Sequence, residues 1–262
     1  MQFTISYLAV DRLGALAGLT PSGISPMHDL APTVAAMRQS IGEDTLGKLD
    51  DLLVEQKLAD TGEDGVVPAS RFLGFLGALF VPEKCVQSRL REPDGCSDTY
   101  FILYDGAWLR LEAARGRFTV TGPFSEHTVR LCLKADAEAA LAGEELRFLV
   151  ERREPDRIHS AVIRSDEKGY PFFGAILTPG ERSRKTYIHA FAKTAENRQW
   201  IAEMAAGDRE FVLPEGETGE KPGDQSANEK KHSYRNALRG FLIALAVNAA
   251  AAVILSILRA VL

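Results

Sequence analysis

Residues 99–114 read TYFILYDGAWLRLEAA, with an apolar run on either side of Asp105 and Gly106. An Asp-Gly pair between alternating hydrophobic residues is the strongest short-range signal for a β-hairpin, because both turn residues must adopt positive φ. The stretch therefore predicts two antiparallel strands joined by a two-residue turn.

The flanking segments extend this hairpin into a larger sheet. KCVQSRLRE at 84–92 alternates between apolar and polar residues, and RFTVTGPF at 117–124 has the same period of two. A period of two is typical of strands with one buried face. Residues 84–124 therefore predict an antiparallel meander.

The preceding part, residues 1–82, is predicted to be mainly helical. FTISYLAVDRLGALAGL at 3–19 starts with strand-forming residues and continues with helical spacing, and TLGKLDDLLVEQKL at 45–58 has leucines three and four residues apart. After a Gly-containing turn, a helix is expected over 68–80, with Pro68 at its first position. Its expected core side consists of Phe72, Phe75, Leu76, Leu79 and Phe80.

Residues 125–212 predict a second α/β half. The segment 128–134 fits a strand or the start of a helix, and the alternation of Val129, Leu131 and Leu133 favours a strand. A helix is expected over 137–153. Three strands and a closing helix follow, at 157–165, 170–179, 186–194 and 195–207. Helices followed by strands, twice along residues 1–212, indicate an α+β domain with a mainly antiparallel sheet.

Composition narrows the classes of function. Hydrophobic residues make up 45% of the 262 residues and charged residues 26%, as in folded globular proteins. The formal net charge of −5 provides no basic surface for general nucleic-acid binding. Cys85, Cys96 and Cys132 form no C-x-x-C pair, so reduced thiols are expected. The first residues lack the basic and apolar regions of a signal peptide.

The C-terminal segment 239–262 is predicted to be a single transmembrane helix. Gly240 to Leu258 are 19 residues without a charge, and a bilayer span needs about 20. The flanking charges are Lys230, Lys231, Arg235 and Arg239 before the segment and Arg259 near its end. The excess of cations before the span predicts a tail anchor with the N-terminal domain in the cytoplasm. A buried core helix is the alternative.

Residues 213–238 are rich in Pro, Gly, Glu, Lys, Ser and Asn, which predicts a flexible linker between domain and anchor. Within the anchor, one face is marked by residues four apart: Ala244, Asn248, Ala252 and Ser256. Small residues allow close helix approach, and Asn248 requires a hydrogen-bond partner in lipid. We expect this face to pack on a second copy or on a membrane partner; the alternative is an Asn without a partner.

No motif for catalysis, metal binding or cofactor binding occurs. None of the five histidines has a metal-ligand spacing, and no nucleotide-binding glycine motif is present. Ser125 and His127 are two residues apart, but Ser125 is expected to be a helix cap or turn residue. The adjacent carboxylates Asp50-Asp51 and Glu144-Glu145 are expected to face solvent. A metal site between His159 and His189 is a minor alternative.

Two helices are expected before the 99–114 hairpin, an order that also occurs in winged-helix DNA-binding domains. A recognition helix presents polar side chains to base edges. Residues 68–80 offer only Ser70 and Arg71, so this helix is expected to belong to the core. No nucleic-acid partner is predicted.

The order of elements in residues 1–124 resembles the N-terminal half of the EspG-type ESX (type VII) secretion-associated chaperones. The resemblance lies in FTISYLAVDRLGALAGL, in KLDDLLVEQKLADTGEDGVVPASRFLGFLGALFVPEKCVQSRL and in the hairpin YFILYDGAWLRLEAA. It implies a non-enzymatic protein that recognises a helical secretion substrate by surface contact. The resemblance assigns no binding residues in this sequence, because no motif fixes them, and a C-terminal anchor is not expected of that family.

The sequence as a whole predicts a tail-anchored, non-enzymatic membrane protein without a cofactor, whose cytoplasmic domain binds a protein partner. One alternative is a membrane-tethered enzyme with a pocket near Tyr170, Arg182, Arg184 and His189. The other is a sensor domain. A deep pocket with buried, convergent ionisable groups would favour the enzyme, and an apolar surface would favour the adaptor.

Overall fold

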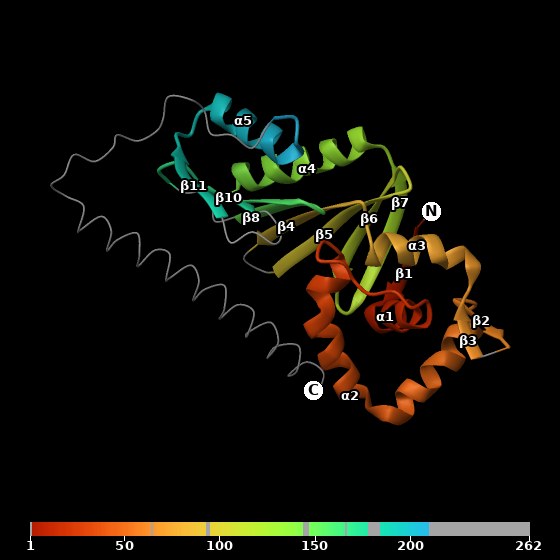
Figure 1. Cartoon of the computed structure of the whole chain (residues 1–262). Coiled ribbons are helices and arrows are strands. Elements are labelled where there is room, and N and C mark those ends of the chain that lie inside the picture. Colours follow the sequence, from red (N-terminus) through yellow and green to blue (C-terminus); the bar gives the residue numbers. More distant parts are fainter. Residues whose placement is uncertain are drawn as a thin grey trace. The chain divides into compact units, whose positions relative to one another are not determined.

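The computed structural model describes residues 2–63, 65–92, 95–143, 147–165, 167–177 and 184–209 (Figure 1). These residues lie in one compact unit, Met1–Phe211. The predicted linker 213–238 and the predicted membrane segment 239–262 lie outside the described residues. None of the helices within the described ranges is long and apolar enough to cross a membrane.

A nine-stranded antiparallel sheet is the centre of the fold, with the order β1-β7-β6-β5-β4-β8-β9-β10-β11. A separate two-stranded hairpin pairs β2 with β3. The strands are β1 (Gln2–Ser6), β2 (Ala59–Gly62), β3 (Gly65–Pro68), β4 (Lys84–Glu92), β5 (Gly95–Tyr104), β6 (Ala107–Ala114), β7 (Arg117–Phe124), β8 (Arg147–Glu154), β9 (Arg157–Arg164), β10 (Tyr170–Leu177) and β11 (Arg184–Phe191). The helices are α1 (Tyr7–Leu16), α2 (Pro26–Glu55), α3 (Ser70–Phe80), α4 (Glu126–Ala142) and α5 (Ala195–Ala206). The predicted α+β class with a large antiparallel sheet is confirmed.

The hairpin predicted from residues 99–114 is present as β5 and β6. Tyr104 faces Ala107 across the turn, and Asp105 and Gly106 have φ values of 50° and 72°. Strands β4 and β7 extend the hairpin into a meander. The strand order then passes from β4 to β8, so the second half of the domain joins the same sheet.

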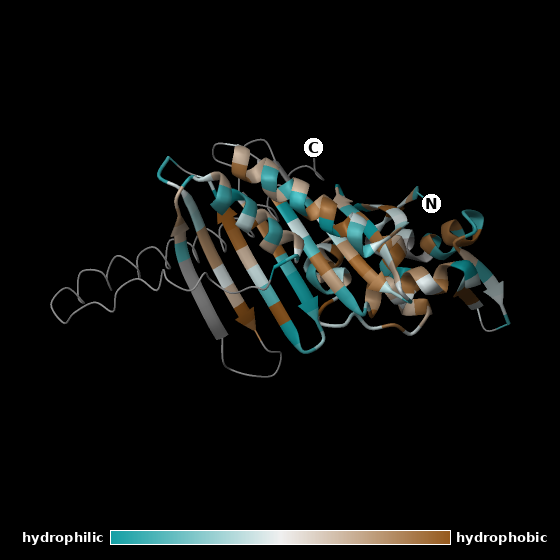
Figure 2. Cartoon of the chain, turned by 90° about the horizontal axis from the view of Figure 1, so that it is seen from above, coloured by the Kyte–Doolittle hydropathy of each residue, from teal (hydrophilic) through white to brown (hydrophobic). Residues whose placement is uncertain are grey.

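The two faces of the sheet are covered by different helices (Figure 1). We call the first the α2 face; Tyr100, Leu111 and Val120 lie on it and share a core with α1, α2 and α3. The opposite face, which we call the α4 face, is covered by α4 and α5, and α4 contacts β4, β8 and β9. Strands in Figure 2 carry both hydrophobic and hydrophilic residues, as expected for alternation between two faces.

The core under the α2 face is made mainly of aromatic and aliphatic side chains from nine elements, β1, β2, β4 to β7 and α1 to α3. Its fully buried members include Leu13 of α1, Leu76 of α3 and Phe118 of β7. The predicted core side of the helix over 68–80 is correct, since Phe75, Leu76, Leu79 and Phe80 are buried and Phe72 is partly buried. This helix therefore packs on the core, as expected.

Two elements of the second half differ from the sequence prediction. The segment 128–134, predicted as a strand, lies within helix α4, because Val129 and Leu133 are buried while Leu131 is 54% exposed. The expected helix over 137–153 ends at Ala142, and β8 starts at Arg147. Phe148 and Val150 alternate toward the α4 face, and this period of two belongs to a strand.

Two boundaries in the N-terminal half were also wrong. Pro68 is the last residue of β3, where it pairs with Ala59, so α3 begins at Ser70. Helix α2 is much longer than the predicted segment 45–58 and contains Pro32. Its start is defined by Ser25, whose side chain accepts a hydrogen bond from the Met27 amide, and by Pro26 in the first turn.

Candidate functional site

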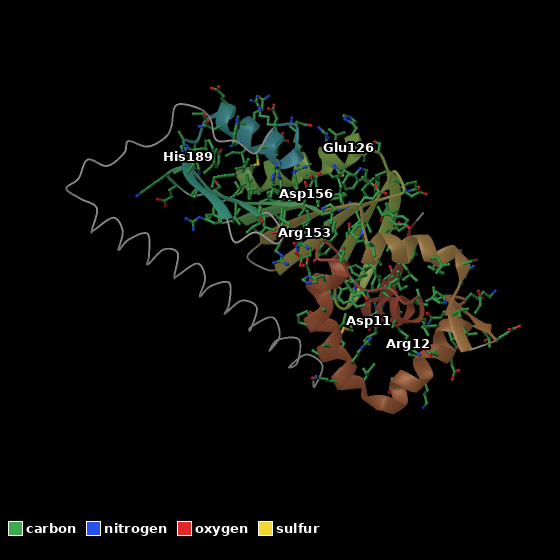
Figure 3. The ribbon with its side chains drawn as sticks, in the orientation of Figure 1. Asp11, Arg12, Glu126, Arg153, Asp156 and His189 are labelled. Atoms are coloured by element: carbon green, nitrogen blue, oxygen red, sulfur yellow. The ribbon has the colours of Figure 1, made fainter. Side chains whose placement is uncertain are left out.

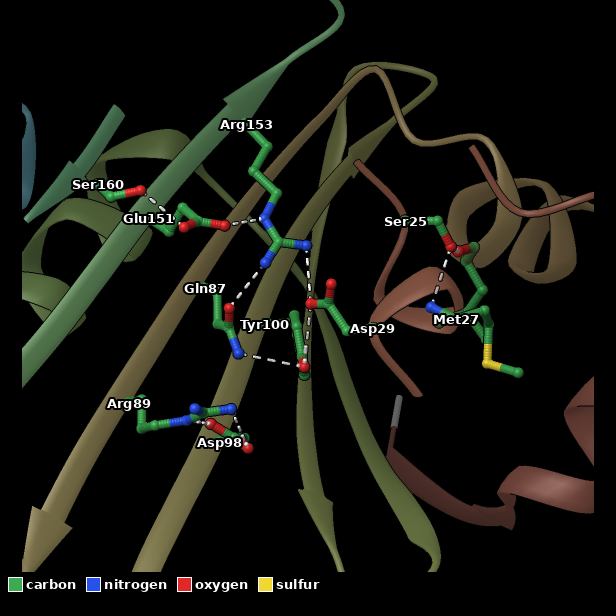
Figure 4. Close-up of polar contacts among 11 residues, drawn as sticks. Ser25, Met27, Asp29, Gln87, Arg89, Asp98, Tyr100, Glu151, Arg153 and Ser160 are labelled. Atoms are coloured by element: carbon green, nitrogen blue, oxygen red, sulfur yellow. Dashed lines mark hydrogen bonds and ion pairs between the residues drawn. The ribbon is translucent and has the colours of Figure 1, made fainter. Parts of the chain in front are cut away.

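A polar cluster lies on the α2 face, where the start of α2 meets strands β4, β5 and β8 (Figure 4). Its centre is Arg153 of β8, whose side chain is 8% exposed. One terminal nitrogen of Arg153 lies 2.7 Å from Asp29 Oδ2, and the other donates to Gln87 Oε1 at 2.8 Å. The Nε atom donates to Glu151 Oε1. All three guanidinium nitrogens are therefore hydrogen-bonded.

The cluster continues to both sides of Arg153. Ser160 on β9 donates to the second oxygen of Glu151 at 2.7 Å. Gln87 donates its amide to the Tyr100 hydroxyl at 3.2 Å, and that hydroxyl lies 3.5 Å from Asp29 Oδ2. The result is a closed set of hydrogen bonds that joins the first turn of α2 to four adjacent strands.

Burial and neighbouring charges shift the pKa values of three groups here, Arg153, Tyr100 and Cys85. Burial alone lowers the pKa of Arg153, but the nearby carboxylates of Glu151 and Asp29 outweigh burial and raise it. Burial raises the pKa of the Tyr100 hydroxyl. Burial also raises the pKa of the neighbouring Cys85 thiol to about 12, so this thiol is protonated at neutral pH.

Two groups of the cluster, the Cys85 thiol and the Arg153 guanidinium, are not placed to react with a substrate. A nucleophile or general base needs a reactive ionisation state and access to a substrate. The Cys85 thiol is fully buried, and the Arg153 guanidinium is committed to its partners. The cluster has a structural effect: the hydrogen bond between Arg153 and Asp29, which are 124 positions apart in the sequence, fixes α2 against the sheet.

Beyond Arg153 the same sheet face is lined by aliphatic side chains of β8, β9 and β10. We call this surface the aliphatic face; its residues are Leu149, Ile158, Val162, Ala175 and Leu177. The strand register places them on the side of Glu151 and Arg153. Ala175 is buried and the other four are half-buried. None of the described helices makes a substantial contact here, since α1, α2 and α3 gather toward the β1–β5 part of the sheet (Figure 1).

Tyr170 lines a cleft, as the enzyme alternative predicted. The cleft has a volume of about 750 Å³ and lies between α4, the start of α5 and the start of β10. Of its charged residues, Glu138, Lys193 and Arg198 are exposed and Lys134 is half-buried, so none is fully buried as in a typical active site. Arg182 lies outside the described residues, and the side chain of Arg184 is likewise not described.

His189 and His159 are not brought together. His159 faces Ile176 of β10, whereas His189 faces Phe172 of the same strand. The two positions are four residues apart, which corresponds to roughly 13 Å along a strand, and β10 lies between the two histidines. Figure 3 shows His189 at the far edge of the sheet, on β11. The described residues contain no group of three potential metal ligands.

Two other residues considered in the sequence analysis, Ser125 and Asp50, stabilise helices of the fold. Ser125 is the N-cap of α4 and accepts a hydrogen bond from the Thr128 amide, as expected. Asp50 is not simply a solvent-facing carboxylate, because Arg12 of α1 donates two hydrogen bonds to it at 2.7 and 2.6 Å. This pairing lowers the pKa of Asp50. Glu144 and Glu145 lie outside the described residues.

The residues of the anchor and its flanks all lie outside the described part of the chain. They are Ala244, Asn248, Ala252, Ser256, Lys230, Lys231, Arg235, Arg239 and Arg259. Sequence reasoning missed Arg153 and the aliphatic face. The pattern Glu151-x-Arg153 is an available signal, because residues two apart in a strand share a face, but the sequence pattern of 137–153 predicts a helix.

Comparison with known proteins gives a structural resemblance but no match in sequence. No model of a known protein family and no curated protein sequence matches the chain. Among solved structures, the chain resembles the Mycobacterium tuberculosis type VII secretion system chaperone EspG5, determined in complex with a PE25–PPE41 dimer. The TM-score is 0.48 at 10% identity, over 82% of this chain and 99% of that chain. The predicted resemblance to the EspG-type chaperones is thus found, and it is weak.

Proposed function

We propose that this chain is a non-enzymatic adaptor that binds a protein partner and is held at a membrane by residues 239–262. The observation that carries the proposal is the aliphatic face. An open face of an antiparallel sheet normally carries polar residues, because it meets water. Here Leu149, Ile158, Val162 and Leu177 occupy these positions. Such a surface favours a partner that removes it from water.

The proposed occupant is an amphipathic helix of the partner protein. Side chains of this face are aliphatic, and the adjacent charges of Glu151 and Arg153 are already paired with each other. The surface therefore offers shape and apolar area and no free charge at its centre, which suits the apolar side of a helix. A helical secretion substrate of the type VII class is the partner that the resemblance of residues 1–124 implies.

The membrane part of the proposal is supported by the sequence. Residues 240–258 carry no charge and are long enough for a bilayer span. The 26 residues of the linker 213–238 have a root-mean-square reach of roughly 25–30 Å if flexible. The domain would then stand clear of the cytoplasmic surface and remain accessible to a partner. The face of Ala244, Asn248, Ala252 and Ser256 would pack on a second helix.

The absence of an enzymatic role is also a proposal. It is supported by the exposed charges of the cleft and by the paired state of Arg153. The buried thiol of Cys85, with its raised pKa, adds to this support.

Photo-crosslinking in living cells tests the adaptor. The full chain would carry p-benzoylphenylalanine at Val162, with the exposed position Thr61 on the β2–β3 hairpin as the matched control. We expect a discrete crosslink to another protein from position 162 only. That protein, once purified, should bind the full chain in detergent and lose at least about tenfold in affinity to the Val162→Asp variant.

Other results of the same experiment would contradict the proposal. A crosslink from position 162 to residues 239–262 of the same chain would mean that the anchor covers this face. A crosslink to a second copy would make the face a dimer interface. Equal labelling from positions 61 and 162 would mean that no specific partner binds.

A further inference from the structure

A second surface, on the opposite side of the sheet, has an unusual concentration of unpaired positive charge. This is the cleft of about 750 Å³ between α4 and α5. Its main polar residues are Lys134 and Glu138 of α4, Tyr170 of β10, Lys193 and Thr194 before α5, and Arg198 of α5. Three cations thus face one carboxylate within a chain whose net charge is −5.

The lysines of the cleft lack a counter-ion within the described part of the domain. Neither Lys134 nor Lys193 forms an ion pair with a described residue, whereas Arg130, one turn before Lys134, is paired with Glu126 and Asp208. Glu203, which Lys134 influences electrostatically, already accepts hydrogen bonds from Arg209 and Gln199. The charges of the cleft are therefore available to a ligand.

The floor of the cleft supplies a further donor. Tyr170 is 1% exposed, and its hydroxyl oxygen accepts a hydrogen bond from Arg198 Nε at 3.2 Å. No acceptor for the hydroxyl proton of Tyr170 is found among the described residues. A buried hydroxyl normally has its hydrogen-bonding capacity satisfied, so this proton suits an acceptor oxygen supplied from outside.

The backbone adds to the positive potential. Helix α5 starts at Ala195 with Thr194 as its N-cap, and it has 12 residues. The N-terminus of a helix carries a partial positive charge that favours anions. Two lysines, an arginine, a buried hydroxyl and this helix end all favour a negatively charged oxygen ligand.

We propose that this cleft binds the carboxylates of an acidic peptide segment in a protein partner. The cations come from three segments, α4, the residues before α5, and α5 itself. Lysines bind oxygens as separate point charges, which suits several carboxylates spaced along a peptide. Glu138 among them disfavours a compact phosphate dianion.

The site is separate from the proposed adaptor surface. Tyr170 and the helices α4 and α5 lie on the α4 face, whereas the aliphatic face lies on the other side of the sheet. A change at Val162 should therefore leave acidic-peptide binding unchanged. Failure of one proposal does not imply failure of the other.

Fluorescence anisotropy with a labelled octaglutamate peptide and the full chain in neutral detergent tests the proposal. An octaglutamine peptide of equal length is the uncharged probe. We expect octaglutamate to bind and octaglutamine not to bind, with affinity falling as salt rises. The double variant Lys134→Ala/Lys193→Ala should weaken binding by about tenfold or more. The matched control Lys48→Ala/Lys84→Ala removes two exposed lysines elsewhere and should have no effect.

Three outcomes would overturn the proposal. If both double variants weakened octaglutamate binding equally, the effect would come from the net charge of the protein and not from this cleft. Unchanged binding by the Lys134/Lys193 variant would place the peptide elsewhere. Displacement of the peptide by inorganic phosphate at lower concentration than by free glutamate would make the site a phosphate site. Circular dichroism and thermal unfolding of each variant show whether its fold is intact.

Discussion

The buried Arg153 side chain is stabilised by two carboxylates, because it forms ion pairs with both Asp29 and Glu151. Replacing it by Met would leave both carboxylates without their partner in a largely buried cluster, which costs about 3–5 kcal/mol of unfolding free energy. Urea unfolding followed by circular dichroism measures this loss. As the control, Arg209→Ala removes an exposed partner of Glu203 and should cost much less unfolding free energy, because solvent screens this pair. Equal effects of the two changes would argue against the cluster as a structural element.

Cys85 is predicted to resist alkylation in the folded domain. Its pKa is about 12, against an ordinary value of 9.0, because burial disfavours the thiolate. At pH 8 only roughly one thiol in ten thousand is ionised at that pKa. Peptide mass spectrometry after iodoacetamide should show Cys85 modified in urea only, and the half-buried Cys132 modified sooner. Fast modification of folded Cys85 would contradict the burial.

The same shift predicts a dependence of stability on pH. Because the pKa of Cys85 is higher in the folded state than in the unfolded state, the folded state keeps the thiol proton up to a higher pH. The contribution of Cys85 is therefore complete below pH 9 and is lost as the pH rises toward 12. A Cys85→Ala variant should lack this part of the alkaline decrease in unfolding free energy.

At the scale of elements, α4 explains why one prediction was wrong. Val129, Leu131 and Leu133 alternate in the sequence, but burial follows Val129, Leu133 and Ala137, which are four residues apart. Leu131 lies on the exposed side of α4, and its position between Val129 and Leu133 makes the sequence look like a strand with a period of two. We expect Leu131→Asp to change the unfolding free energy by less than about 0.5 kcal/mol. Leu133→Asp, which buries a carboxylate, should cost about 3 kcal/mol or more.

Helix α5 depends on the glycine that follows it. Gly207 has a φ of 82°, and a Cβ atom there would overlap the guanidinium of Arg152, which donates to the Ala205 carbonyl. The change Gly207→Ala should therefore cost more than the roughly 1 kcal/mol typical of a left-handed glycine. Gly23→Ala, at a position with open space and an ordinary φ, should be nearly neutral in the same thermal unfolding assay. Similar melting temperatures for the two variants would contradict the close packing at α5.

The elements that the sequence predicts well are those with a local physical cause. Asp105-Gly106 fixes the β5–β6 hairpin through its positive φ values, and the three strands β9 to β11 follow from alternation. Helix α2 could not be predicted over its full length, because Pro32 and the polar residues of 38–45 weaken the helical pattern. The helix instead packs on the core through Met27, Val34 and Leu53, contacts that tertiary structure alone provides.

At the scale of the whole molecule, the candidate sites depend on strand order, which no local pattern contains. Tyr170 was predicted to line a pocket and does. The pairing of β4 with β8 brings Arg153 beside Gln87, and the position of α2 adds Asp29. The same order leaves the β8–β10 part of one face without a described helix. These long-range arrangements are the part of the site that the sequence could not predict.

The proposed membrane attachment would give the proposed adaptor its location, and it would also decide whether the aliphatic face is available. If residues 239–262 insert in lipid, they cannot cover Leu149 and Val162. We expect the full chain to remain in the membrane pellet after extraction with alkaline carbonate. The variant Val247→Arg/Ala251→Arg places two charges near the middle of the segment, at a cost of roughly 5–7 kcal/mol for insertion, and should move to the supernatant. Recovery of the unmodified chain in the supernatant would contradict the anchor. In that case the apolar segment would be free to compete with a protein partner for the same sheet face.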